Sequence, residues 1–72
     1  MEPFTDINKA KQFIQNYQGE VKDFLLPISN SMNDPVGINM AMLLDVMLKK
    51  GWEPDGFDQY DGYRVYKYKT ME

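Results

Sequence analysis

Three aspartates recur at every third position near the C-terminus, at Asp55, Asp58 and Asp61. Carboxylates at short intervals suggest a calcium loop, but such a loop places its oxygen ligands at alternating positions, with Gly sixth and Glu twelfth. The observed spacing does not fit that pattern. Turn formation accounts for Asp55 and Asp61, because each is followed by Gly. We therefore predict no metal site.

Groups for other kinds of chemistry are missing from the sequence. There is no His and no Cys, so the chain lacks the commonest general base, a thiol nucleophile, and imidazole or thiolate zinc ligands. Ser29 and Ser31 lie in a polar segment with no base nearby in sequence, and no Gly-rich phosphate loop is present. We predict that the protein is not an enzyme and binds no cofactor.

The composition indicates one small folded domain, residues 1–72. With 43% hydrophobic and 14% aromatic residues, the chain is typical of a globular protein rather than a disordered one. No apolar run reaches the roughly eighteen residues of a membrane helix, and the N-terminus is too polar for a signal peptide, so we expect no membrane association and a cytoplasmic location. The net charge of −3 lacks the basic footprint of a duplex-binding protein.

An apolar stripe with helical spacing runs through the first third of the chain. Its members are Ile7, Ala10, Ile14, Tyr17, Val21, Phe24 and Ile28. The pattern predicts a helix over about 6–26, with Thr5 or Asp6 as its N-cap and Pro27 at its end. Gly19 could break this helix in two, but the stripe keeps its phase across the glycine, which favours a continuous helix.

A second helix is predicted over about 35–50. Asp34 is suited to the N-cap and Pro35 to the first turn, while Gly51 is suited to the position after the C-cap. The helix is apolar on nearly every side. Either the first helix and the strands cover it, or part of it meets another chain. A chain without disulfides or metal ligands has a core worth only about 3–5 kcal/mol, which favours the second interpretation. The predicted self-association residues are Met40, Met42, Met47 and Leu48.

The C-terminal third predicts a β-hairpin over about 57–69. Asp61-Gly62 separates two runs of aromatic and β-branched residues and suits a type I′ turn. In that register Tyr60 faces Tyr63, Asp58 faces Val65, and Phe57 faces Tyr66. The predicted fold class is therefore α+β, with two antiparallel helices followed by a two-stranded β-hairpin.

Exposed aromatic residues on the hairpin lead to a functional hypothesis. Alternation along the second strand separates Tyr63 and Val65 from Arg64, Tyr66 and Tyr68, and only one face can pack on the helices. We expect a partner-binding surface because Tyr and Arg are enriched in binding hot spots; its residues are Trp52, Phe57, Tyr60, Arg64, Tyr66 and Tyr68. The simpler interpretation is that these are ordinary strand residues and that the lysines protect an edge.

Protein binding, with homodimer formation, is the predicted role of this small accessory or regulatory protein. The alternative is single-stranded nucleic-acid binding, because the strand from Tyr63 to Lys69 alternates aromatic and basic residues as a base-stacking surface does. Nucleic acid is the less favoured partner because the chain is acidic overall.

Overall fold

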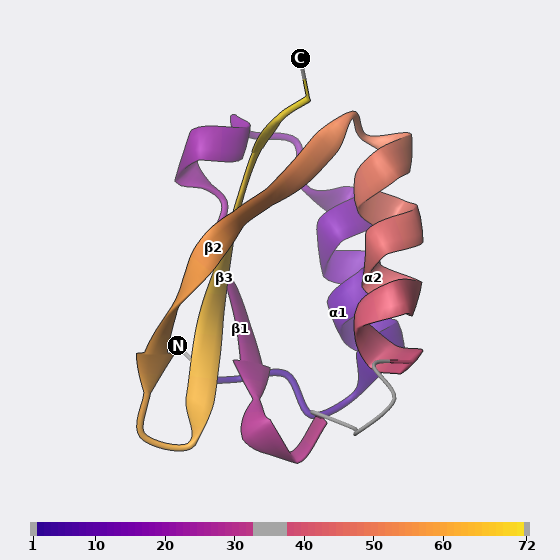
Figure 1. The fold of residues 1–72 in the computed structure, drawn as a ribbon. Helices are drawn as coiled ribbons and strands as arrows, with labels where there is room; N and C mark the ends of the chain where they lie inside the picture. Colours follow the sequence, from indigo (N-terminus) through magenta and orange to yellow (C-terminus); the bar gives the residue numbers. More distant parts are fainter. Residues whose placement is uncertain (1, 33–37, 72) are drawn as a thin grey trace.

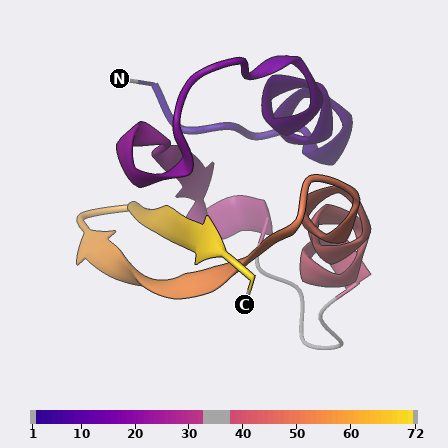
Figure 2. The ribbon, with the colours of Figure 1, turned by 90° about the horizontal axis from the view of Figure 1, so that it is seen from above.

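The computed structural model describes residues 2–32 and 38–71. The elements run in the order α1 (Ile7–Asn16), a 3-10 turn η1 (Val21–Asp23), β1 (Leu26–Ser29), a 3-10 turn η2 (Asn30–Met32), α2 (Ile38–Lys49), β2 (Trp52–Tyr60) and β3 (Tyr63–Thr70). Figure 1 shows α1 and α2 side by side next to the sheet, and Figure 2 shows the same arrangement from above. The α+β class predicted from the sequence is confirmed.

The sheet has three antiparallel strands in the order β1-β3-β2, rather than the predicted two. The added strand, β1, lies between the helices in sequence, so the predicted order of two helices and then strands holds only in part. Leu26 of β1 pairs with Tyr66, and Ser29 pairs with Tyr63. The physical reason for the third strand is that an isolated two-stranded hairpin is marginally stable in water.

The predicted helix over 6–26 is wrong beyond Asn16. Asp6 does cap α1, accepting a hydrogen bond from the Asn8 amide at 2.9 Å. At the other end Tyr17 is extended, and its hydroxyl turns back to donate to the Glu20 carbonyl at 2.8 Å. The Tyr17 ring occupies the space that a Cβ on Gly19 would need. The helix thus ends before Gly19, and the glycine does not have a positive φ.

The apolar stripe misled the helix prediction because its later members also reach the core without a helix. Phe24 and Ile28 are buried together with Ala10 and Ile14 of α1, yet they come from a loop and from β1. Pro27, expected to end a helix, instead lies within β1, where its carbonyl accepts a hydrogen bond from the Phe4 amide at 2.9 Å. A proline is tolerated there because β1 is at the edge of the three-stranded sheet.

The second helix is present and ends within one residue of the predicted position. It covers Ile38–Lys49, and Gly51 follows it with a φ of 76°, as expected for a glycine after the C-cap. The expected start at Asp34 and Pro35 lies outside the described residues. Lys50 joins the two helices, because its ammonium group donates to the Tyr17 carbonyl at 2.8 Å.

The hairpin register is confirmed, and the hairpin is longer than predicted. Tyr60 pairs with Tyr63, Asp58 with Val65 and Phe57 with Tyr66. Strand β2 begins at Trp52 rather than at residue 57, and a bulge between Pro54 and Phe57 contains the Asp55-Gly56 pair that reads as a turn in the sequence.

The turn at Asp61-Gly62 is present but is not of type I′. Gly62 has a φ of 88°, whereas Asp61 does not have a positive φ, and type I′ requires positive values at both positions. We expect Gly62→Ala to lower the free energy of unfolding by about 1–2 kcal/mol, because a Cβ is strained in this left-handed region. Gly62→Asn should lose less, since Asn tolerates the same region better. Urea unfolding of the two variants checks this; equal stability of Gly62→Ala and the natural chain would contradict it.

Candidate protein-binding site at the hairpin end

The structure separates the six predicted partner-binding residues into two groups. Trp52, Tyr66 and Tyr68 are buried in the core. Phe57 and Tyr60 are 47% and 48% exposed, and Arg64 is half-buried. The expectation that Tyr66 and Tyr68 lie on an exposed face is therefore wrong.

The face assignment fails because the helices pack on the other side of β3 from the one expected. In the observed register, Tyr66 lies beside Leu26 of β1, and both belong to the buried cluster. Tyr63 is half-exposed. Val65, on the same face as Tyr63, is also buried, between Pro27 of β1 and Asp58 of β2. Alternation along one strand indicates which residues share a face, but it does not indicate which face the helices cover.

The predicted self-association residues are also divided. Met47 is buried in the core, whereas Leu48 is 49% exposed and Met42 is half-buried. The Met40 side chain lies outside the described part of the structure. Sequence reasoning missed Leu44, which is 41% exposed and lies one helical turn before Leu48.

A compact group of side chains surrounds Phe57 on one face of the hairpin. The Phe57 ring lies 5.3 Å from the Tyr66 ring, centroid to centroid, and the Arg64 guanidinium carbon lies 4.6 Å from the Phe57 ring centroid. A cation over a ring at this distance is attracted by the negative face of the ring. Phe57 is thus held between a buried tyrosine and an arginine while half of its surface meets solvent.

Hydrogen bonds fix the arginine in this position. The Arg64 Nε donates to the Gln59 Oε1 at 2.7 Å, and its Nη1 donates to the Tyr66 hydroxyl at 3.4 Å. The amide nitrogen of Gln59 in turn donates to the carbonyls of Tyr60 and Tyr63, at 2.8 and 3.0 Å. Gln59 therefore links the arginine to the backbone on both sides of the turn. The sequence contains no obvious signal for this role of Gln59.

A second pair of rings lies at the turn. Tyr60 and Tyr63 stack with centroids 5.1 Å apart and ring planes 13° from parallel. Because Phe57 pairs with Tyr66 and Tyr60 pairs with Tyr63, these two ring pairs lie on opposite faces of the hairpin. We call Phe57, Gln59 and Arg64, which share the first of these faces, the hairpin-end surface.

Lysines further along β3 are paired with acids of β2. The Lys67 ammonium lies 2.8 Å from an Asp58 carboxylate oxygen, and the Lys69 ammonium lies 3.7 Å from one of Glu53. The hydrogen bond from Asp58 raises the pKa of Lys67 above its ordinary value, and the Asp58 charge adds to this. These pairs neutralise the basic character that the sequence of β3 suggests.

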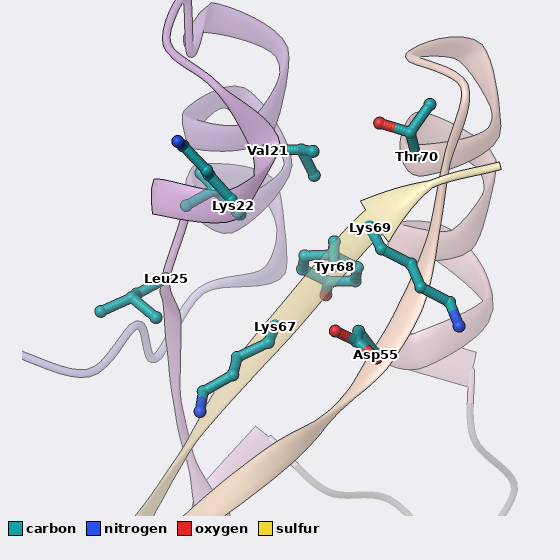
Figure 3. A pocket seen from close by; sticks show the side chains of 9 residues that line it. Val21, Lys22, Leu25, Asp55, Lys67, Tyr68, Lys69 and Thr70 are labelled. Carbon is teal, nitrogen blue, oxygen red and sulfur yellow. The ribbon is translucent and has the colours of Figure 1, made fainter.

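A pocket of about 410 Å³ lies between η1 and the end of β3. Val21, Phe24, Leu25 and Tyr68 line it with largely apolar side chains, and three lysines, Asp55 and Thr70 line the rest. Figure 3 shows the ammonium groups of Lys67 and Lys69 directed away from Tyr68, while the Asp55 carboxylate lies closer to it. The pocket therefore has mixed polar and apolar walls, without a set of polar groups converging on one point.

Searches of the described residues for other kinds of site give no candidate. Within residues 2–32 and 38–71, no three Asp or Glu side chains come together as metal ligands would. In the same ranges no helix combines the length and apolarity needed to cross a membrane. Comparisons with protein-family models, curated proteins and solved structures find no match to this chain.

Proposed function

We propose that this chain is a small non-enzymatic protein that acts by binding another protein through the hairpin-end surface. The observation that carries the proposal is the state of Phe57, which is 47% exposed yet fixed by the Arg64 guanidinium 4.6 Å from its ring centroid. Aromatic and arginine side chains supply most binding hot spots in protein interfaces.

Rigidity supports this assignment as much as exposure does. Binding requires side chains to lose rotamer freedom, at about 0.5–1.5 kcal/mol for each one immobilised. Arg64 has already lost much of that freedom through its hydrogen bonds to Gln59 and Tyr66. A partner that buries the exposed part of Phe57 therefore gains apolar contact with little further ordering of Arg64.

Single-stranded nucleic-acid binding is the less favoured alternative. A stacking surface needs several accessible rings with cations beside them. Tyr66 and Tyr68 are buried, and Lys67 and Lys69 are paired with acids. The rings that remain accessible on the hairpin are those of Phe57, Tyr60 and Tyr63, with Arg64 as the cation beside Phe57.

A capture experiment with matched variants tests the proposal. The immobilised chain is incubated with lysate of its source organism, the captured protein is identified, and its affinity is measured for the natural chain, Phe57→Ala and Arg64→Ala. We expect each substitution to weaken binding about tenfold or more, as for a hot-spot residue. Leu25→Ala serves as the control for Phe57, because Leu25 is 40% exposed and lies before β1, away from the turn.

Two outcomes would contradict protein binding at this surface. One is capture that Phe57→Ala and Arg64→Ala leave unchanged while Leu25→Ala abolishes it. The other is anisotropy of a labelled oligothymidylate that rises with added chain and falls steeply with salt, because counterion release produces that salt dependence. The second result would favour the nucleic-acid alternative.

A further inference from the structure

The outer side of α2 carries an apolar stripe that the other described elements leave exposed. Leu44 and Leu48 are 41% and 49% exposed, and Ala41 is exposed on the same side of the helix. The core contacts of α2 come from the opposite side, through Leu43, Val46 and Met47. Figure 1 shows α2 at the far side of the molecule from the hairpin turn. The stripe and the hairpin-end surface are therefore separate.

An acidic and a basic side chain lie beside the stripe, so a second copy of the helix can offer each of them an opposite charge. Asp45 and Lys49 flank the two leucines on one side, and both are exposed. Their own ion pair is loose, with 3.8 Å between the ammonium nitrogen and the nearest carboxylate oxygen. Exposed pairs of this kind contribute little to stability, so either group can change its partner at low cost.

An antiparallel copy of the helix brings these charges together between chains. In a two-fold interface, if one residue contacts a second residue of the other copy, the second residue also contacts the first one there. If the two-fold symmetry axis passes midway between Leu44 and Leu48, the leucines of the two copies interdigitate. Asp45 of one copy then lies within about 3 Å along the helix axis of Lys49 in the other, at a rise of about 1.5 Å per residue. The two-fold rotation also keeps both charged groups on the same side of the interface.

We propose that the chain associates with a second copy of itself through antiparallel contact of the two α2 helices, with Leu44 and Leu48 at the centre and Asp45–Lys49 pairs between copies. Two leucines per chain form a small contact. The dimer is accordingly weak and exchanges rapidly, as interfaces below about 1,200 Å² do.

Sedimentation equilibrium at chain concentrations up to about 1 mM, which corresponds to the weak end of specific affinities, tests the contact. We expect the natural chain to dimerise and Leu44→Ser or Leu48→Ser to raise the dimer dissociation constant about tenfold or more, because each substitution removes apolar contact twice in a symmetric interface. Leu25→Ser is the control; Leu25 is 40% exposed but lies outside α2. A natural chain that stays monomeric throughout, or an equal loss in Leu25→Ser, overturns the proposal.

Charge variants test the antiparallel arrangement. In the Asp45→Lys homodimer, positions 45 and 49 of the two copies hold four cations, and in the Lys49→Glu homodimer they hold four anions. Like charges then repel across the interface, so each variant alone dimerises more weakly than the natural chain. An equimolar mixture of the two forms a heterodimer at least as tight as the natural homodimer, because each cation then meets an anion across the interface. Lys9→Glu, which makes on α1 the same change in net charge as Lys49→Glu makes on α2, leaves dimerisation unchanged. A mixture that associates no better than its components overturns the antiparallel contact.

The proposed dimer contact and the proposed binding role of the hairpin-end surface can be tested independently of each other. Phe57→Ala leaves the dimer dissociation constant unchanged, because Phe57 lies on β2 and outside the helical contact. Leu48→Ser likewise leaves capture of a different protein by the hairpin intact.

Discussion

Phe24→Ala is expected to unfold most of the population at 25 °C. Removing a buried phenylalanine typically lowers the free energy of unfolding by about 3–5 kcal/mol, and the core of a chain this small supplies about the same amount. Phe24 is 2% exposed. Its ring contacts aromatic rings from several elements, so its removal loses several core contacts at once.

The ring distances explain why the loss should be near the upper end. The Phe24 centroid lies 4.8 Å from that of Tyr17, 5.1 Å from that of Trp52 and 5.9 Å from that of Tyr68. These contacts join the end of α1 to β2 and β3. Without the ring, the segment between α1 and β1 loses its main attachment to the sheet.

Circular dichroism and urea unfolding test this prediction. Trp52, the single tryptophan, reports unfolding by fluorescence, but it contacts Phe24 directly, so the circular dichroism signal is the safer measure. Phe57→Ala is the matched control, because Phe57 is half exposed and its loss should lower stability by about 1 kcal/mol or less. A Phe24→Ala chain that unfolds at the same urea concentration as Phe57→Ala would contradict the role of Phe24 in the core.

Tyr68→Phe is expected to have the opposite effect and to raise the free energy of unfolding by about 1–3 kcal/mol. The Tyr68 hydroxyl is buried and makes no hydrogen bond to any residue that the structure describes, and a buried polar group without a partner costs about this much. Phenylalanine keeps the ring contacts with Phe24 and Trp52 and removes the hydroxyl alone. The gain should appear at neutral pH as a higher midpoint in urea.

Tyr17→Phe is the control with the opposite sign. Its hydroxyl donates to the Glu20 carbonyl at 2.8 Å, so we expect a loss of about 0.5–1.5 kcal/mol, the usual net value of one hydrogen bond. If both Tyr→Phe variants lose stability equally, the Tyr68 hydroxyl has a partner in solution.

The stability gained by Tyr68→Phe should grow above about pH 10, the ordinary pKa of tyrosine. Burial raises the pKa of Tyr68 in the folded chain, and the neighbouring Tyr66 adds to the shift. Below pH 10 the residue is neutral in both the folded and the unfolded state. Above pH 10 the unfolded chain loses this proton and the folded chain keeps it, so the free energy of unfolding falls by about 1.4 kcal/mol per pH unit for this group. The phenylalanine variant lacks that decrease, so unfolding curves between pH 8 and 11 should diverge.

Local signals in the sequence predicted α2 and the hairpin register well. Gly51 marks the end of α2, and Asp61-Gly62 sets the pairing of Tyr60 with Tyr63, because both signals depend on backbone conformations that glycine adopts easily. These features are decided within a few residues, so neighbouring sequence is sufficient to predict them.

Features that depend on distant contacts were not predictable in the same way. Strand β1 exists because Leu26–Ser29 can pair with β3, which lies far along the chain. The spacing of Phe24 and Ile28 is compatible with a helix and with the observed loop and strand, and tertiary pairing decides between them.

The candidate site was predictable only in part, because residue type is local information whereas burial depends on distant contacts. Phe57, Tyr60 and Arg64 were singled out by residue type. Phe57 and Arg64 are in contact on one face of the hairpin, whereas Tyr60 stacks on Tyr63 on the other. Tyr66 and Tyr68 were placed on the wrong face because alternation does not show where the helices pack. Gln59 was missed because its role depends on bonds to Arg64 and to two backbone carbonyls.

Site-specific photo-crosslinking in the source organism tests whether a protein partner contacts Phe57. A benzoyl-phenylalanine replaces Phe57 in one variant and Lys9, an exposed residue of α1, in a second. We expect a covalent adduct with one defined protein from position 57 and none from position 9. Adducts of equal yield from both positions, or none from position 57 while position 9 is efficient, would contradict protein binding at the hairpin end.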